Sequence, residues 1–474
     1  MKHIKKIGAV MLSTGILLSA MPLLPVCAED AAAGDAVEMT ARITLSETSA
    51  TAEGKNVKID GTKITISASG SYEFSGKLND GQIIVNVEDT TLDKETVKVF
   101  FNNVDITGST AAPFYVVNAK NTSINLMDGT VNYLRDGEKY GADTTAVIYA
   151  KDDLTIKSGG TLGDGKLKIV ANNQQGIHCS NDLKITGGDI DVKAELADGV
   201  RGKTSVEIKG GKLDVNAGGD GVKSTKGYVI ISGGDTEIKA GNDAVQGEAN
   251  VTDTKTNEVH NGISITGGSL KANGDRALTN VAGTAEIKGG VVFATATKDT
   301  LKEGQTDADL KDNSIKVTAL QPVLLFNTTE QQVKDLRVEL KEAGTETAVF
   351  SKNPNKKYDY VLISSPELKV GSKYDLYIGG AKAEPSEIAI AEGITTVADV
   401  VSHAEVEKPE IDPLDINGDG SVDVSDAVIL ARFLAEDKTV KMVDGALNRI
   451  DTNGDGLRNG DDVITILRRI AHLD

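Results

Sequence analysis

The sequence lacks tryptophan altogether and is poor in proline and cysteine. Its 474 residues include 9 prolines and 2 cysteines, against 50 glycines. Glycine enrichment without abundant proline or a strict triplet period excludes a collagen-like chain and most proline-rich disorder. The absence of tryptophan also argues against a sugar-binding module built on a tryptophan platform.

Positive charge is scarce as well. Lys and Arg number 51 and Asp and Glu number 70, which gives a net charge of −19 at pH 7. Nucleic-acid binding requires clustered basic side chains against phosphates, so we expect no nucleic-acid partner. The acidity is compatible with binding of divalent cations, and the length predicts roughly two to four domains.

The first 28 residues have the order of a secretory signal peptide. Lysines precede an uncharged stretch over residues 7–26, and a small-residue cleavage site ends at Ala28. A membrane anchor, or a lipid acceptor at Cys27, is the weaker alternative. No later apolar run approaches the ~20 residues of a membrane helix. We therefore expect a secreted, extracellular protein with no membrane span in the mature chain, where Cys179 is the remaining cysteine and no internal disulfide can form.

The middle of the chain carries an internal repeat. Gly-Gly pairs recur at intervals of 23, 23, 34 and 22 residues, with an isoleucine two residues before each pair. Apolar and polar residues alternate after each pair, as at Ile190, Val192 and Ala194, which is the pattern of a half-buried strand. The long interval contains a polar insertion over 248–261. The pairs begin at Gly187, Gly210, Gly233, Gly267 and Gly289.

Strands that recur every 22–23 residues without intervening helices are typical of stacked rungs. We therefore predict a mainly β fold, a right-handed parallel β-helix solenoid over residues 29–395, with the repeated isoleucines and valines in buried columns inside it and glycines of positive φ at its corners. Residues from about 315 to 395 are expected to form a small C-terminal β cap that protects the last rung. A linker over 396–411 then leads to a small α-helical domain over 412–474.

The C-terminal segment contains two copies of a calcium-binding loop, 36 residues apart. Oxygen-bearing side chains stand at loop positions 1, 3, 5, 9 and 12, a glycine at position 6 allows the sharp turn, and position 7 offers its backbone carbonyl. Ca²⁺ takes six to eight oxygen ligands, so each loop is predicted to hold one ion. The predicted ligands are Asp415, Asn417, Asp419, Ser421, Asp423 and Asp426 in the first loop, and Asp451, Asn453, Asp455, Leu457, Asn459 and Asp462 in the second.

A regulatory EF-hand pair is the competing interpretation of these loops. It requires a helix before each loop and a bidentate Glu at position 12, whereas Asp stands there in both loops and Pro409 and Pro413 precede the first. Helices are expected only after the loops, at 427–434 and 463–470. The segment 412–474 resembles a type I dockerin, a module that attaches secreted proteins to the cohesins of a cellulosome scaffold. This resemblance implies a cohesin partner contacted by loop positions 10 and 11, which are Val424, Ser425, Gly460 and Asp461.

Residues 43–390 resemble a family of secreted, calcium-containing β-helix carbohydrate-binding domains, formerly a domain of unknown function. The resemblance rests on the repeated Asp-Gly-Val motif and on the segments 80–85, 99–107, 150–156, 363–371 and 377–380. It implies an architecture similar to pectate lyases, calcium between rungs, and binding of cellulose or of acidic sugars such as polygalacturonate. It implies no enzymatic activity.

Three aspartates fall at the same point of consecutive repeats, namely Asp198, Asp220 and Asp243. Their carboxylates would lie ~5 Å apart on neighbouring strands and would repel one another unless they were protonated or bridged by a cation. They are therefore candidate Ca²⁺ ligands, and the bound ion could bridge to a uronate carboxylate. The alternative, left open, is that each Asp side chain caps its own turn at a glycine corner.

Basic residues follow these aspartates a few positions later in the repeat. Arg201, Lys203 and Lys223 are candidates for gripping sugar carboxylates, or for the base of a lyase. The alternative is a solvated edge that pairs with the aspartates.

Other side chains of possible interest have no clear partners in the sequence. His178 and Cys179 have no readable catalytic neighbour and are expected to pack within a strand. Tyr149 and Tyr228 could stack on sugar rings, but the sequence leaves their orientation open.

Together these features predict a secreted, non-catalytic protein that binds plant cell-wall polysaccharide with the help of Ca²⁺. The dockerin would attach it to a cohesin of a scaffold in a cell-surface cellulosome. No catalytic residues are assigned. The alternatives are a calcium-dependent pectate lyase on the same scaffold and a structural adhesin that binds no sugar.

Overall fold

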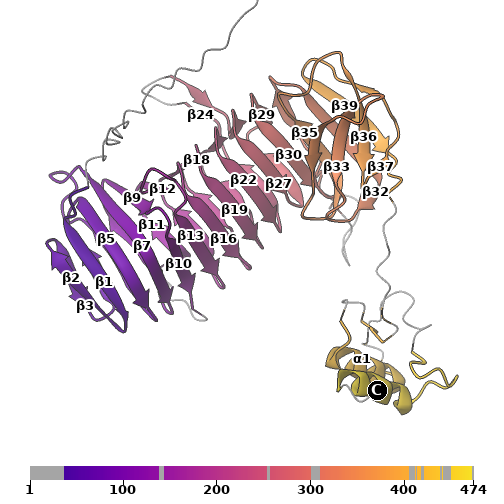
Figure 1. The fold of residues 1–474 in the computed structure, drawn as a ribbon, viewed down its shortest axis with the longest axis horizontal. Coiled ribbons are helices and arrows are strands. Elements are labelled where there is room, and N and C mark those ends of the chain that lie inside the picture. The colour runs from indigo at the N-terminus through magenta and orange to yellow at the C-terminus, as the bar shows by residue number, and fades with distance from the viewer. Residues whose placement is uncertain are drawn as a thin grey trace, which may run out of the picture.

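A computed structural model describes residues 37–137, 144–252, 257–299, 310–404, 412, 414–417, 421–437, 440 and 450–471. Strands make up 51% of the structure and helices 6%, so strand pairing determines the architecture. The strands from β1 to β30 lie side by side in a long array, and a second group of strands follows β30 (Figure 1). The predicted signal peptide, residues 1–28, lies outside the described residues.

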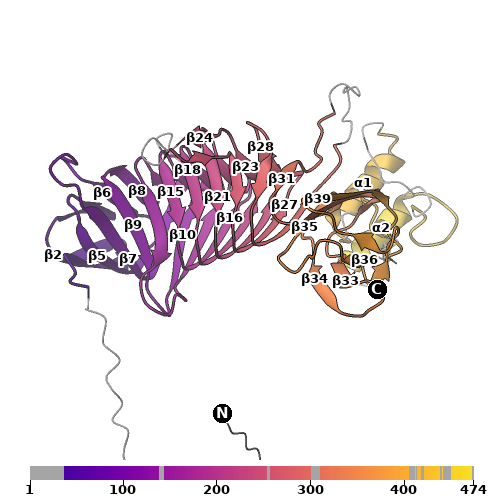
Figure 2. The same ribbon diagram turned by 90° about the horizontal axis from the view of Figure 1, so that it is seen from above.

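One sheet has ten strands and runs along one side of the array, as the view from above shows (Figure 2). Apart from the antiparallel pair at its start, between β3 and β4, its strands pair in parallel. In order, its members are β3 (Val57–Asp60), β4 (Lys63–Ile66), β6 (Gln82–Asn86), β8 (Phe114–Asn118), β11 (Ala146–Ala150), β14 (Gln175–Cys179), β17 (Val200–Gly202), β20 (Val222–Ser224), β23 (Asp243–Gly247) and β28 (Arg276–Asn280).

The largest sheet has 22 strands. Those before the repeat are β1 (Ala41–Glu47), β2 (Ser49–Gly54), β5 (Gly70–Leu78), β7 (Thr96–Gly108), β9 (Asn121–Leu126), β10 (Val131–Asp136), β12 (Leu154–Ser158) and β13 (Lys166–Ala171). Those within it are β15 (Asp182–Ile185), β16 (Asp189–Ala194), β18 (Ser205–Ile208), β19 (Lys212–Ala217), β21 (Tyr228–Ile231), β22 (Asp235–Ala240), β26 (Ile263–Ile265), β27 (Ser269–Asn273), β29 (Ala285–Ile287) and β30 (Val291–Ala296). Those after it are β31 (Val317–Ala319), β32 (Val323–Gln332), β35 (Tyr358–Ser364) and β39 (Ile394–Val400).

The sequence repeat determines how neighbouring repeats pair. Strands one repeat apart pair in parallel and in register, so that Ile190 of β16 lies opposite Leu213 of β19, and Val192 opposite Val215. The same register links β15 with β18 and β14 with β17. Equivalent positions of successive repeats therefore form straight columns of side chains across the strands.

The inward columns make one continuous hydrophobic core. The isoleucine before each Gly-Gly pair is at most 1% exposed, and burial of such a side chain stabilises the fold by roughly 1.5–3 kcal/mol. These residues are Ile185, Ile208, Ile231, Ile265 and Ile287. The prediction that the isoleucine columns are buried is confirmed.

The glycine pairs occupy tight corners. The second glycine of each repeat pair has φ between +75° and +91°, a conformation that side chains with a Cβ rarely adopt. A Cβ on Gly211 would also lie 2.5 Å from the carbonyl oxygen of Gly188 in the preceding repeat. The predicted structural role of these glycines is confirmed.

The predicted fold class, a right-handed parallel β-helix solenoid with a small C-terminal β cap, is wrong. The strands form a nearly closed, barrel-like sheet of mixed strands, accompanied by two helices. β1 pairs antiparallel with β2, and β35 pairs antiparallel with both β30 and β32. The repeat predicts parallel register between neighbouring repeats, but it carries no information about how the strands before and after it pair. After the repeat, β31, β32, β35 and β39 join the 22-stranded sheet.

The region after residue 320 has its own core. A five-stranded antiparallel sheet, adjacent in sequence to β32, β35 and β39, packs its inner side chains in a second hydrophobic cluster. Residues 396–400, which the sequence analysis assigned to the linker, lie in β39 and pair with β32. The five strands are β33 (Val338–Glu342), β34 (Ala348–Lys352), β36 (Lys373–Ile378), β37 (Ala381–Lys382) and β38 (Ile388–Ala389).

The remaining elements are short. The polar insertion of the long repeat interval contains a small hairpin, β24 (Val251–Thr252) and β25 (Val259–His260). The C-terminal segment contains α1 (Val424–Leu434) and α2 (Gly460–Ile470), which share a small core of apolar side chains. Within the described ranges, neither helix is long and apolar enough to cross a membrane.

Candidate functional site

The two C-terminal helices begin inside the predicted calcium loops. The Asp423 side chain accepts a hydrogen bond from the Ser425 amide at 2.7 Å, and the Asp426 side chain accepts one from the Asp423 amide at 2.9 Å. Asn459 and Asp462 form the same capping box at α2. Capping boxes satisfy amides that have no partner inside the helix. Each helix therefore begins three residues earlier than the sequence analysis predicted.

The aspartate at loop position 12 joins the start of its loop to the start of its helix. Asp426 Oδ1 accepts hydrogen bonds from the amides of Ile416 at 2.8 Å and Asn417 at 3.0 Å. Asp462 Oδ1 accepts the amide of Thr452 at 2.8 Å. Both carboxylates are fully buried. This role explains why an Asp, whose side chain is short, stands where an EF-hand has a Glu.

The second loop leaves a carboxylate oxygen in need of a cation. Asp451 Oδ2 accepts the Gly456 amide at 2.9 Å, whereas Asp451 Oδ1 is buried with no hydrogen-bond partner among the described residues. A buried, unpartnered carboxylate oxygen is costly unless an ion or a donor meets it. Asn453 and Asp455 lie beside it and exchange two hydrogen bonds. This donor set fits a hard cation such as Ca²⁺.

The first loop is described only in part. Asp415 is 3% exposed, and the Asn417 amide group donates to Ser425 Oγ at 2.9 Å. Ser421 is exposed, as is Leu457 at the corresponding position of the second loop. Asp419 lies outside the described residues. Within the part of the chain that the structure describes, no group of three or more His, Cys, Asp or Glu side chains is arranged to hold a metal ion.

The predicted cohesin contacts lie at the two helix starts. Val424 and Ser425 begin α1, Gly460 and Asp461 begin α2, and all four are exposed. The apolar Val424 side chain is 56% exposed. Their exposure leaves them accessible to a partner.

The three repeat aspartates do form a column, but their carboxylates already have partners. Asp198 Oδ1 accepts the Asp220 amide at 3.0 Å, and Asp220 Oδ1 accepts the Asp243 amide at 3.1 Å. Each carboxylate thus holds the backbone of the next repeat rather than its own turn. Hydrogen bonds from amides stabilise the ionised form and reduce the repulsion along the column.

Basic side chains pair with the same carboxylates. Lys223 Nζ lies 2.6 Å from Asp220 Oδ2, and an Arg201 nitrogen lies 3.7 Å from Asp198 Oδ2. Lys203 is exposed and lies outside this column; its amide donates to the Cys179 carbonyl. The contacts of Arg201 and Lys223 agree with the alternative in which the basic residues pair with the aspartates.

The third aspartate is the most strongly held. Arg276 makes two contacts with the Asp243 carboxylate, at 2.6 and 2.7 Å, and Thr279 Oγ1 donates to Asp243 Oδ1 at 2.8 Å. Such a two-pronged guanidinium–carboxylate pair is among the strongest side-chain contacts. Burial, and next the nearby charge of Asp220, raise the pKa of Asp243, although the bonds from Thr279 and Arg276 act against this.

A polar hollow of about 420 Å³ opens beside the last two aspartates. Its walls alternate carboxylates, cations and amides, so that a ligand would meet donors and acceptors at short intervals. A ligand with many hydroxyl groups could donate to these carboxylates and accept from these cations and amides. The residues that define it include Asp220, Lys223, Asp243, Gln246, Asp275 and Arg276.

Sequence reasoning missed Gln246 and Arg276. Gln246 lies opposite Lys223 and Arg276 lies opposite Asp243, so both are the next members of columns that had been identified. The register of the repeat would have found Gln246. The insertion over 248–261 shifted the spacing and hid Arg276.

His178 and Cys179 differ in their surroundings. Cys179 is fully buried, as predicted, and burial raises the pKa of its thiol to about 12, so it has no nucleophilic character at neutral pH. His178 is only half-buried and points away from the core.

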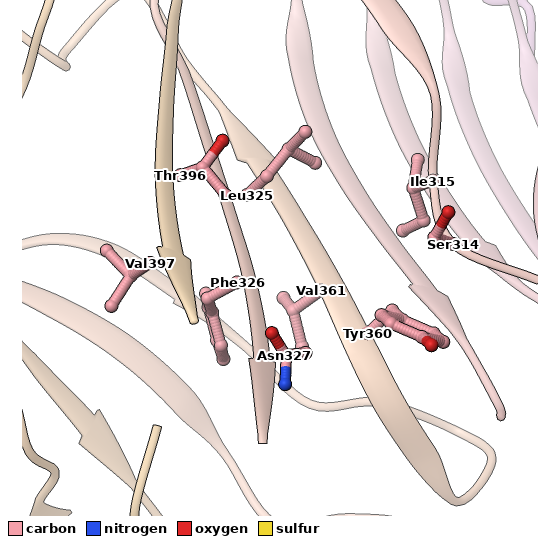
Figure 3. Close-up of a pocket in the computed structure, with 9 residues that line it drawn as sticks. All are labelled: Ser314, Ile315, Leu325, Phe326, Asn327, Tyr360, Val361, Thr396 and Val397. Atoms are coloured by element: carbon pink, nitrogen blue, oxygen red, sulfur yellow. The ribbon is translucent and has the colours of Figure 1, made fainter. Parts of the chain in front are cut away.

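A second, apolar pocket of about 150 Å³ lies on the C-terminal part of the large sheet (Figure 3). Side chains of β39, β32 and β35 form a row, with Ser314 and Ile315 beyond Tyr360 (Figure 3). Ligand pockets are usually at least about 300 Å³. None of the predicted site residues lines this pocket, so the polar hollow is the better candidate site.

Comparisons with known proteins match two separate regions of the chain. The family described as "Carbohydrate-binding domain-containing protein" matches residues 60–275, and the dockerin type I domain matches residues 413–471. A curated carbohydrate-binding domain-containing protein of Acetivibrio thermocellus is 43% identical over 138 residues, which is 28% of this chain and 45% of the relative. The chain therefore spans less than half the length of that relative.

A solved structure also shows similarity. The polysaccharide lyase-like protein from C. thermocellum, determined as a gadolinium derivative, is 30% identical, with a TM-score of 0.41. The match covers 53% of this chain and 92% of that one. By the two family matches alone, the chain combines a region similar to the carbohydrate-binding domain family with a C-terminal region similar to type I dockerin domains.

Proposed function

We propose that this chain is a secreted, non-catalytic protein that binds plant cell-wall polysaccharide and attaches to a scaffold cohesin through its dockerin. The observation that carries the proposal is the polar hollow beside Asp220 and Asp243, whose alternating donors and acceptors suit a hydroxyl-rich ligand. The two family matches support the pairing of sugar binding with cohesin attachment.

The surroundings of two of the three candidate bases, Arg201 and Lys223, support a binding role over lyase chemistry. A general base has to be free to accept a proton from its substrate. Lys223 instead lies 2.6 Å from the Asp220 carboxylate, and Arg201 is paired with Asp198. These pairs position cationic donors for a sugar hydroxyl or carboxylate without supplying a base.

Calcium has its clearest place in the dockerin loops. The residues that would hold it are the six predicted ligands of each loop, with Asp451 Oδ1 as the oxygen that most needs a cation. A bound ion would neutralise the carboxylates that converge on each loop. Asp426 and Asp462 each hold the start of a loop and the start of the following helix. An ordered loop would therefore fix the helix starts, where the predicted cohesin contacts lie.

The decisive experiment measures retention of the full chain on insoluble polygalacturonate and on cellulose, with Ca²⁺ and with EDTA. The absorbance of unsaturated sugar products is recorded in parallel. Retention without absorbance is expected. A rising absorbance would instead identify a lyase, and lack of retention on every polysaccharide would leave an adhesin attached through its dockerin.

Matched variants assign the binding to the hollow. The double substitution Lys223→Ala and Gln246→Ala should weaken retention, because it removes two donors from the lining. Lys226→Ala is the control, since Lys226 is exposed three residues away and does not line the hollow. Equal retention of both variants would place sugar binding elsewhere on the chain.

Cohesin attachment is tested by substitutions at the helix starts. Val424→Asp and Asp461→Lys, made singly and together, change the exposed residues at the starts of α1 and α2. Loss of cohesin binding in only one single variant would show that one helix start dominates. Unchanged binding in the double variant would contradict the predicted contacts.

A further inference from the structure

The ten-stranded sheet presents one straight column of outward-facing side chains. The parallel register places Tyr115 opposite Tyr149, and Tyr149 opposite His178. Each of these residues is half-buried, whereas its neighbours in the same strand point into the core. We name this set the surface column. Its members are Tyr115, Tyr149, His178, Arg201, Lys223, Gln246 and Thr279.

The first half of the column is aromatic. The rings of Tyr115 and Tyr149 are nearly parallel, with 14° between their planes and 5.4 Å between their centroids. This separation exceeds the 3.5–4.0 Å of atomic contact, so the rings overlap with an offset. The Lys151 ammonium lies over the Tyr115 ring, 5.5 Å from its centroid, so the ring faces meet neighbouring side chains and the ring edges point outward. The His178 ring follows, 5.0 Å from Tyr149. Ile84, which lies opposite Tyr115 on the other side, extends the apolar strip by one strand.

His178 continues this strip as an uncharged ring. Thr145 Oγ1 lies 2.7 Å from His178 Nδ1 and fixes the ring orientation. Burial, and then the neighbouring Arg201 charge, lower the pKa of His178 to about 4. At neutral pH the column therefore changes from apolar to charged between His178 and Arg201.

The second half of the column leads into the polar hollow. Lys223 and Gln246 are members of the column and also line the hollow. Arg201 Nε, at the junction of the two halves, is buried without a hydrogen-bond partner among the described residues. The column is thus a single line with apolar rings at one end and hydrogen-bonding groups at the other.

We propose that the surface column is the platform for one polysaccharide chain, which lies across the strands with its sugar rings against the exposed edges of Tyr115 and Tyr149. Further along the same chain, hydroxyl or carboxylate groups enter the hollow beside Lys223 and Gln246. The inference rests on the proposed function and adds the binding residues and the direction of the ligand. From Tyr115 to Thr279 the column crosses six strand spacings, or about 29 Å at ~4.8 Å each. A ligand of several sugar units is therefore needed to use both halves.

The test compares aromatic variants of the full chain by calorimetric titration with soluble oligosaccharides of galacturonic acid and of glucose. The double variant Tyr115→Ala and Tyr149→Ala should bind about tenfold more weakly, since buried aromatic contacts dominate such interfaces. Tyr149→Phe keeps the ring and should bind within about twofold of the unmodified chain. The control is Tyr133→Ala, because Tyr133 is also partly exposed but lies on the 22-stranded sheet beside Arg135.

The dependence of affinity on ligand length is a second readout. It would not change if the tyrosines had a purely structural role. The affinity of the unmodified chain should rise with oligosaccharide length until the ligand spans both halves, and the rise should be smaller in the double variant. Thermal melts confirm that each variant folds. If the chain binds sugar and the double variant binds equally well at every length, the inference is overturned while the proposed function stands. If the unmodified chain binds no sugar at all, both fail.

Discussion

Two regions of this protein carry aspartates at regular spacing, and the structure treats them differently. In the repeat, Asp198 and Asp220 each accept the amide of the next aspartate in the column, and each has a basic partner. In the second dockerin loop, Asp451 keeps a buried carboxylate oxygen with no partner among the described residues. The aspartates of both regions are regularly spaced, but those of the repeat have donors, whereas Asp451 has an oxygen that needs a cation.

The difference teaches that acidic spacing alone does not identify a calcium site. Carboxylates one strand apart can be stabilised by amides and by cationic side chains that the same repeat supplies. When a loop folds several oxygens around one point and few donors lie nearby, the carboxylates need a bound ion to stabilise them. The question to ask of each aspartate is which donors reach it.

The largest expected effect separates the two regions by their calcium binding. Asp451→Ala should remove or weaken one calcium site by at least about tenfold, because it deletes a loop ligand. Asp198→Ala should leave the number of bound ions unchanged. Equilibrium dialysis of the full chain with Ca²⁺ measures both. A lost ion in the Asp198 variant would show that the repeat aspartates hold calcium after all.

The next effect is a gradient of stability along the aspartate column. Asp243→Ala should lower the free energy of unfolding by about 2–3 kcal/mol, since it removes a buried carboxylate that Arg276 and Thr279 bind. Asp198→Ala should cost about 1 kcal/mol, because its ion pair is longer and its carboxylate is more exposed than that of Asp243. Urea unfolding in EDTA measures the difference. Equal costs would contradict the assigned contacts.

A smaller effect tests whether the dockerin aspartates also act without an ion. Asp462→Ala should destabilise α2 by about 1 kcal/mol even in EDTA, because it removes one half of the capping box. Helical circular dichroism during thermal melting is the measurement. The matched control is Asp461→Ala, one residue earlier, whose side chain is exposed and takes no part in the box. A variant that melts like the control would leave Asp462 with a role in metal binding alone.

A further effect, which depends on pH, concerns the response to acid. Since the pKa of folded His178 is about 4, below its usual 6.5, the unfolded chain takes up the proton first as the pH falls. Stability should therefore decrease between pH 6.5 and 4. His178→Gln should melt with a flatter pH dependence over this range. His403→Gln is the control, because His403 is 51% exposed, and an equal response of both variants would contradict the burial of His178.

The sequence predicted local features better than the overall arrangement. The repeat spacing correctly placed the isoleucines in the core and the glycines at positive φ. It did not predict how β1, β2 and β35 pair, because strands outside a repeat have no equivalent from which their partners can be read. The prediction of a β-helix solenoid with a small cap applied the pairing of the repeat to strands that lie outside it.

The candidate site was predictable wherever the register was visible. Asp198, Asp220, Arg201 and Lys223 all belong to columns that the sequence indicated. The offset stacking of Tyr115 on Tyr149 could not be predicted, since the two residues are 34 apart and precede the regular repeat. The capping role of Asp426 was missed because the loop pattern assigns that residue to the metal alone.

If the surface column holds a polysaccharide as proposed, the in-register pairing of equal repeats makes the ten-stranded sheet a ruler for that ligand. Each added repeat of 22 or 23 residues would lengthen the surface by about one strand spacing, ~4.8 Å, and would leave every existing contact in place. On that proposal, the length of polymer that the column holds would change by duplication of a single short segment of the gene. Affinity would then be adjusted in small, equal steps without redesign of any individual contact.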